Sequence, residues 1–170
     1  MRIGIRGLAV LAVVAVLGST SLAAQQEKGD KEVQLFANAS VSKTSGVSTS
    51  TGTIGLIFGY FASQMLELRF GVIGSGSSSG GTTTGTFILT PGVVVNFVRK
   101  GSKTVPYLGL DGAFASTSSA FGTVTSSSIR PNGGAKFFIS RNVAFDFNIG
   151  YSSASGTQTL DERVGLTVVF

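Results

Sequence analysis

The carboxy-terminal segment, residues 160–170, alternates between apolar and polar or small side chains. Its apolar positions are Val164, Leu166, Val168 and Phe170, and Arg163, Gly165 and Thr167 lie between them. Successive side chains of a β-strand point to opposite faces, so this pattern predicts a strand with one apolar and one polar face. A half-buried strand of a soluble protein and a membrane strand share this pattern, so the pattern of the other segments has to decide between them.

The amino terminus has the three parts of a secretory signal peptide. Arg2 and Arg6 precede an apolar run over residues 8–17, and small residues follow it up to Ala24. The apolar run is too short to cross about 30 Å of hydrocarbon as a helix. We therefore expect a cleaved signal peptide over 1–24 and one domain over 25–170.

Charge and cysteine content exclude several classes. Loss of Arg2 and Arg6 with the signal peptide lowers the formal net charge from +5 to +3, and the basic residues do not form a stripe. A nucleic-acid partner is therefore not expected. The absence of cysteine rules out disulfides and the lipid anchor of lipoproteins.

The absence of both histidine and cysteine also removes most metal sites and the histidine-based triads of hydrolases. We accordingly expect no enzyme, no cofactor and no metal site. The chain after the signal peptide has no apolar run of 18 residues, and thirteen phenylalanines argue against disorder. A fold made of strands remains.

Eight segments show the alternating pattern, each about as long as a tilted membrane strand requires. They are residues 32–41, 53–61, 65–74, 86–97, 105–114, 128–139, 142–151 and 160–170. Four connections are long and rich in Ser, Thr and Gly, at 42–52, 74–85, 115–127 and 152–159, and the three between them are short. This rhythm predicts an all-β, eight-stranded antiparallel up-and-down barrel with long loops on one rim.

The short turns suggest registers. Tyr60 opposite Leu66 keeps apolar residues together, and Lys136 opposite Asp146 makes a cross-strand ion pair inside the barrel. Asp146→Asn is then expected to lower the heat resistance of the barrel. Pro91 predicts a bulge or frayed pairing, and Pro131 predicts a shorter sixth strand.

The composition of the polar face, made of the alternate strand positions between the apolar ones, favours a membrane location. In a soluble barrel this face would meet water and carry many charges, whereas here it is mostly Gly, Ala, Ser, Thr and Asn, which suits a narrow lumen. Its charged residues are predicted to form a lumen network: Glu67, Arg69, Asp111, Arg130, Lys136, Asp146, Asp161 and Arg163. Arg130 and Asp161 fit equally well at a hydrated rim.

The order of several short motifs resembles the small outer-membrane β-barrels of the OmpA/OmpX type. These motifs are Gly59-Tyr60-Phe61, Val105-Pro106-Tyr107-Leu108-Gly109, Lys136-Phe137-Phe138 before Ser140-Arg141-Asn142, and the terminal Phe170. The resemblance implies an outer-membrane location in a Gram-negative envelope, and assembly by the barrel-assembly machinery with Phe170 as its signal. A peptidoglycan-binding domain of that family is absent from this sequence.

The sequence thus predicts a non-enzymatic, monomeric outer-membrane barrel in contact with lipid, with an envelope-structural or surface-contact role through its loops. Two alternatives stay open. The many lumen glycines would suit a small-solute channel, and a soluble periplasmic ligand-binding barrel would bury the apolar parity instead.

Overall fold

The structure is a computed structural model that describes residues 26–44, 47–99, 101–154 and 157–170. The predicted signal peptide, residues 1–24, lies outside the described residues. Within the described part of the chain, no helix is long and apolar enough to cross a membrane.

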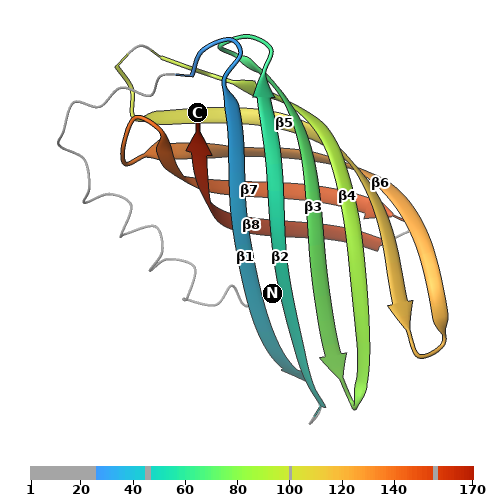
Figure 1. Ribbon diagram of the computed structural model, residues 1–170. Coiled ribbons are helices and arrows are strands. Elements are labelled where there is room, and N and C mark those ends of the chain that lie inside the picture. Colours follow the sequence, from blue (N-terminus) through green and yellow to red (C-terminus); the bar gives the residue numbers. More distant parts are fainter. Residues whose placement is uncertain (1–25, 45–46, 100, 155–156) are drawn as a thin grey trace.

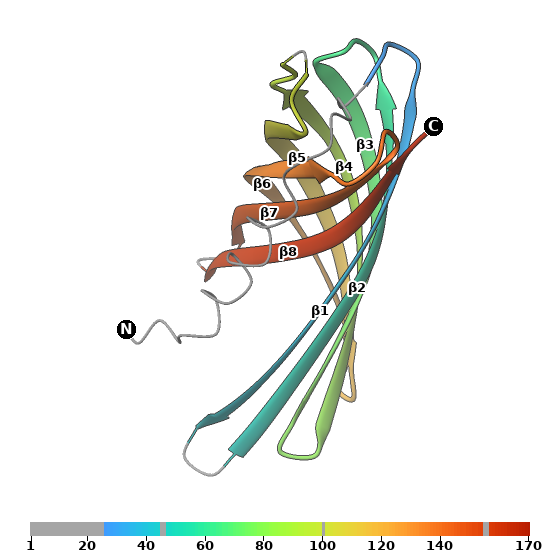
Figure 2. The same ribbon diagram turned by 90° about the vertical axis from the view of Figure 1, so that its left-hand side faces the viewer.

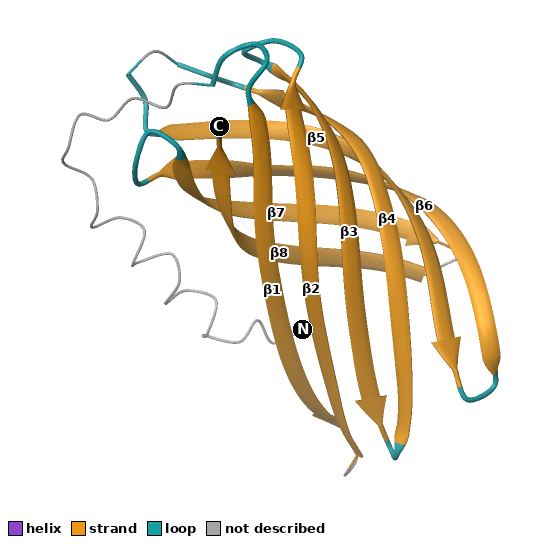
Figure 3. Ribbon diagram, in the orientation of Figure 1, coloured by secondary structure: helices purple, strands orange, loops and turns teal. Residues whose placement is uncertain are grey.

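Eight antiparallel strands form a closed barrel in which each strand pairs with its neighbours in sequence (Figures 1 and 3). The strands are β1 Lys31–Thr44, β2 Val47–Phe61, β3 Leu66–Ser79, β4 Thr82–Asn96, β5 Thr104–Ser119, β6 Gly122–Phe138, β7 Val143–Ala154 and β8 Thr157–Val169. The barrel closes where β1 pairs with β8. The predicted fold class is confirmed.

The Ser/Thr/Gly stretches are strands rather than the long loops that we expected. The β3–β4 pairing continues to Ser79 opposite Thr82, and the turn is Gly80-Gly81 with φ of 56° and 85°. Positive φ at both central residues is typical of the two-residue turns that match strand twist. Hydroxyl groups also meet across strands, as between Thr86 and Thr117 at 3.0 Å. Alternation of Ser, Thr and Gly lacks the apolar contrast by which these extensions could have been recognised.

The β6–β7 register is as predicted, with Phe137 opposite Phe145. The register that we predicted for β2 and β3 is wrong by two residues, because Tyr60 lies opposite Leu68 and not Leu66. The turn is longer than expected: Ser63 Oγ accepts hydrogen bonds from the backbone N–H groups of Met65 and Leu66. A shift of two residues leaves every side chain on its predicted face.

Proline interrupts pairing without changing the register. The β4–β5 ladder stops after Leu89 opposite Phe114 and resumes at Gly92 opposite Asp111 with the same offset, so Pro91 causes frayed pairing and no bulge. The β6–β7 ladder is similarly interrupted between Ile129 and Asn132, around Pro131. The sixth strand is nevertheless longer than predicted and not shorter, because β6 continues along β5 down to Gly122.

The seam between β1 and β8 is short. These strands pair from Glu32 opposite Val169 to Phe36 opposite Gly165, and then diverge, as Figure 2 shows. Asn38 still reaches across, donating a hydrogen bond from Nδ2 to the backbone carbonyl of Glu162 at 3.5 Å. The barrel is therefore closed at its turn end and splits along this seam toward its hairpin end.

Candidate functional site: the charged lumen

The turn end of the lumen is closed by apolar side chains. Phe61, Val105, Phe138, Ala144 and Val169 are buried together, and Val98 packs against them. All five come from the inward face of their strands, and they lie where the strands meet the short turns. An eight-stranded barrel has an interior just wide enough for side chains to fill. This cluster therefore blocks the lumen at that end.

Above the apolar cluster lies a first charged layer. Lys136 is fully buried, and its Nζ donates to Glu67 Oε2 at 3.0 Å and to Glu32 Oε2. Arg69 Nε donates to Glu67 Oε1 at 2.7 Å. Asn96 Nδ2 donates to Glu67 Oε2 at 3.0 Å. Glu67 is thus the hub of a network that joins β1, β3, β4 and β6.

The predicted ion pair between Lys136 and Asp146 does not form, although the two residues lie opposite each other in the β6–β7 ladder. Among the described residues, Asp146 accepts its side-chain hydrogen bond from the hydroxyl of Tyr107, at 2.6 Å. The lysine side chain is long enough to reach across the narrow lumen, where two carboxylates offer more favourable charge pairing than one. The register prediction was right and the pairing prediction was wrong.

A second charged layer surrounds Arg130, which is buried. Its Nη1 donates to Asp111 at 3.1 Å, and its Nε and Nη2 donate to the two carboxylate oxygens of Asp161 at 2.9 and 2.7 Å. Arg163 Nε donates to the same Asp161 carboxylate at 2.9 Å. Arg130 therefore lies in the lumen and not at the rim, whereas Asp161 is partly exposed.

Amide side chains connect the two layers. Asn148 Nδ2 donates to the Tyr107 hydroxyl and to Asn132 Oδ1, both at 3.0 Å. Asn132 Nδ2 donates to Asp111 Oδ2 at 2.9 Å. A buried hydrogen-bond network of this kind costs free energy wherever a member lacks a partner, so the paired groups of Asn132 and Asn148 favour one fixed arrangement of this part of the lumen.

Glycines make room for these long side chains. A Cβ on Gly150 would overlap the guanidinium group of Arg130, and a Cβ on Gly134 would come within 2.8 Å of Tyr107 Cζ. The inward glycines therefore do not leave an open bore, as the channel hypothesis supposed. The space beside most of them is occupied by neighbouring polar side chains, and the ring of Phe36 fills the space beside Gly55.

All eight residues of the predicted lumen network are on the inward face, and each takes part in one of the hydrogen bonds or ion pairs described above. The sequence analysis missed Glu32, Tyr107 and Asn148. Glu32 shares its parity with Gln34, and Tyr107 shares its parity with Asp111, so the alternation that placed the other residues could have found both. The described residues contain no group of three or more His, Cys, Asp or Glu side chains placed to hold a metal ion.

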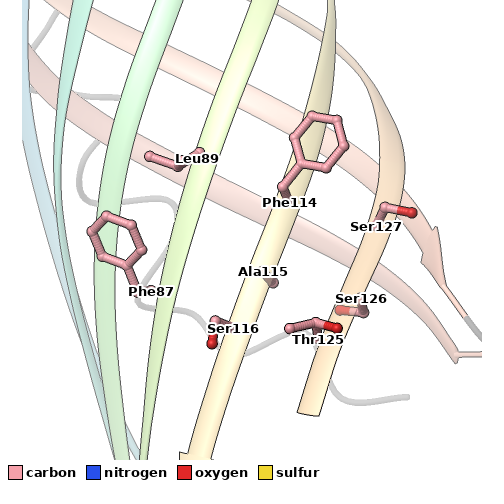
Figure 4. A pocket seen from close by; sticks show the side chains of 8 residues that line it. All are labelled: Phe87, Leu89, Phe114, Ala115, Ser116, Thr125, Ser126 and Ser127. Atoms are coloured by element: carbon pink, nitrogen blue, oxygen red, sulfur yellow. The ribbon is translucent and has the colours of Figure 1, made fainter. Parts of the chain in front are cut away.

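The outer face carries the apolar parity. Large apolar side chains are exposed on every strand, for example Leu108 with 61% of its surface accessible. An open hollow of about 440 Å³ lies on this outer side between β4, β5 and β6 (Figure 4). It is lined by Phe87, Leu89, Phe114, Ala115, Ser116, Thr125, Ser126 and Ser127. Apolar outside and polar inside is the arrangement of a barrel in lipid.

Solved structures with the same fold are small outer-membrane barrels. The N-terminal β-barrel domain of Pseudomonas aeruginosa OprF matches with a TM-score of 0.61 and 14% identity, over 85% of this chain and 100% of that one. OprG from the same organism matches with 0.61 and 13%, over 89% and 99%. Neisserial surface protein A matches with 0.55 and 19%, over 83% and 96%.

No protein-family model and no curated protein sequence matches the chain. At these identities the structural likeness is one of fold alone. By its fold, the chain is a small eight-stranded β-barrel of the kind known from outer membranes.

Proposed function

We propose that this protein is a non-enzymatic, monomeric integral protein of the outer membrane whose contacts are made by its projecting hairpins. The observation that carries the proposal is the reversal of polarity between the two faces: apolar side chains cover the outside, while charged side chains fill the inside. The apolar outer face is suited to contact with lipid. Closure of the barrel pairs the backbone N–H and C=O groups, which cannot form hydrogen bonds with lipid chains. The soluble alternative would leave this apolar surface in water.

A sealed lumen speaks against the channel alternative. In the described part of the chain, the apolar cluster at the turn end and the two charged layers above it fill the lumen with buried side chains, which argues against a continuous aqueous path. In planar bilayers the refolded protein is expected to produce no stepwise conductance. Reproducible single-channel steps from heat-shifted, folded protein would overturn this part of the proposal.

The hairpins beyond the apolar band are the part of the molecule suited to surface contact. Near the β3–β4 turn the outward side chains are small, hydroxylated and exposed, such as Ser78 and Thr83, whereas the β5–β6 turn carries Phe121, which is 93% exposed. Hydroxyl-bearing strands present many donors and acceptors without charge. This favours contact with neutral, hydrogen-bonding surfaces over contact with charged polymers.

Trimming a hairpin in register tests this role without disturbing the barrel. Removing 76–79 together with 82–85 deletes matched residues from β3 and β4, and it leaves Gly80-Gly81 to connect Ser75 with Thr86. The equivalent change in β5–β6 removes 116–119 with 122–125. If the hairpins act, the trimmed proteins stay folded in the membrane and cells lose surface adhesion or change phage sensitivity. Unchanged behaviour for both trimmed proteins would leave only an envelope-structural role.

Two segments of the chain are suited to secretion and insertion into the outer membrane. Residues 1–24 would direct secretion, and the barrel-assembly machinery would receive the chain through Phe170. The Phe170 side chain is 63% exposed on the outer side, and its backbone pairs with Lys31 by two hydrogen bonds of 2.9 Å. An aromatic side chain at the end of the closing strand is thus accessible to a partner.

A further inference from the structure

With its three carboxylates ionised, the first charged layer of the lumen is one positive charge short. Its carboxylates are Glu32, Glu67 and Asp146, and its cations are Arg69 and Lys136. The second layer has two of each sign, so it offers no spare cation. Burying an unbalanced charge is costly unless a further positive charge accompanies it.

The missing charge is needed beside Asp146 and Glu32 and not beside Glu67. Both oxygens of Glu67 accept hydrogen bonds. Asp146 Oδ2 and Glu32 Oε1 are buried without a hydrogen-bond partner among the described residues, although Glu32 Oε1 lies 3.8 Å from Arg69 Nη2. Asp146 therefore carries the least compensated charge of the layer.

Two neutral oxygens on the next strands along the sheet, β8 and β1, are also unpaired among the described residues. Gln34 Oε1 and Thr167 Oγ1 are buried and have no hydrogen-bond partner in the part of the chain that the structure describes, and their residues are 2% and 0% exposed. Gln34 lies opposite Thr167 in the β1–β8 ladder. The mutual backbone hydrogen bonds of Lys31 and Phe170 fix the alternation of this ladder, which makes Gln34 and Thr167 a non-hydrogen-bonded pair with closely spaced side chains.

Gly165 brings the three groups together. It lies opposite Asp146 on β7 and precedes Thr167 by one inward position on β8. The amide group of Gln34 lies over it, because a Cβ on Gly165 would be 3.3 Å from Gln34 Nε2, and a flip of this amide places Oε1 at the same position. The β1–β8 ladder ends at Phe36 and Gly165, so this point also lies beside the place where the barrel splits.

We propose that the lumen holds one monovalent cation, such as Na⁺ or K⁺, between the carboxylate of Asp146, the amide oxygen of Gln34 and the hydroxyl of Thr167. One full negative charge and two neutral oxygens match a hard monovalent ion, whereas a divalent ion would leave the layer with excess positive charge. Oxygen ligands are those that hard cations prefer. The bound ion balances the layer and joins β1, β7 and β8 at the seam.

The test is the thermal unfolding of the refolded barrel in a non-ionic detergent, measured by the heat-dependent gel shift. Sodium or potassium chloride is compared with choline chloride at the same ionic strength, because choline screens charge equally but is too large for the site. The wild-type midpoint is expected to fall by about 5 °C in choline. Equal midpoints in all three salts would overturn the proposal.

Three variants locate the effect. Asp146→Asn removes the excess charge, keeps an oxygen for Tyr107 and supplies an N–H donor for the unpaired oxygens, so its midpoint is expected to be the same in sodium and choline. Thr167→Val is expected to raise the sodium concentration for half-maximal protection about fivefold. Thr90→Val, at another buried lumen threonine, is the matched control and keeps the wild-type dependence.

Two further outcomes count against the site. A cation dependence that survives Asp146→Asn would place the ion elsewhere. A midpoint that changes with pH but not with sodium would show that a proton, and not a metal cation, balances the layer.

Discussion

Lys136 lies directly opposite Asp146 on the neighbouring strand, yet its ammonium group bonds to Glu32 and Glu67 on other strands of the barrel. Lys136→Met keeps the length of the side chain and removes its charge, so it leaves the buried carboxylates of Glu32 and Glu67 with Arg69 as their one remaining cation among the described residues. We expect the free energy of unfolding in detergent to fall by about 3–5 kcal/mol. Lys28→Met, at an exposed lysine, is the control and should change it little. Equal stability of the two variants would mean that the lumen around Lys136 is hydrated.

The packing of Arg130 predicts a difference between two glycines. Gly150→Ala places a methyl group into the guanidinium group of Arg130, whereas Gly74→Ala meets no atom within 4 Å. Overpacking of this kind costs about 1–3 kcal/mol. To relieve it, the arginine has to leave Asp161 or Asn148, whose Oδ1 accepts a hydrogen bond from Arg130 Nη2 at 2.6 Å. Urea unfolding of both variants measures the difference. A Gly150→Ala protein as stable as the Gly74→Ala protein would show that Arg130 does not occupy this space.

The divergence of β1 from β8 predicts early hydrogen exchange at the seam. Beyond Phe36, residues 37–44 pair with β2 alone, so alternate amides of this segment have no strand partner. Residues 49–56 pair on both sides and are the internal reference. Mass spectrometry of exchange in detergent or nanodiscs should find about half of the amides in 37–44 exchanging before those of 49–56. Equal protection of the two segments would mean that β1 and β8 stay paired up to the hairpin end of the barrel.

The terminal aromatic predicts a defect in assembly rather than in stability. Phe170→Ala is expected to lower the amount of barrel in the outer membrane of cells, while the purified variant still refolds in detergent. Phe97→Ala removes another exposed aromatic side chain and is the control for lost contact with lipid. If both variants accumulate to the same level in cells, Phe170 is an ordinary lipid-facing residue.

The fold was predictable because a period of two is visible wherever large apolar side chains alternate with small or polar ones. The same rule placed Arg69, Asp111 and Arg130 on the inward face, since parity does not depend on the exact register. It failed to extend the strands into the Ser/Thr/Gly stretches, where both faces are alike. The cross-strand register could be predicted only for hairpins with short turns. The prediction for β2 and β3 failed because their turn is longer than the sequence suggested.

The pairs within the lumen could not be derived from neighbouring strands. Lys136 meets Glu32 on β1 and Glu67 on β3, which are brought together only when the sheet closes. Tyr107 likewise reaches Asp146 across β6. A local register shows which residues are side by side, whereas the curvature of the closed barrel decides which long side chains meet across its interior.

Heat-modifiability of the membrane-fractionated protein on a cold detergent gel tests the central claim most directly. A closed barrel with a paired lumen resists the detergent until it is boiled, so the unboiled protein, found in the outer-membrane fraction, is expected to migrate faster than the boiled protein. Identical migration of the two samples, with the protein in the soluble periplasmic fraction, would contradict a membrane barrel and would make the apolar parity a buried core.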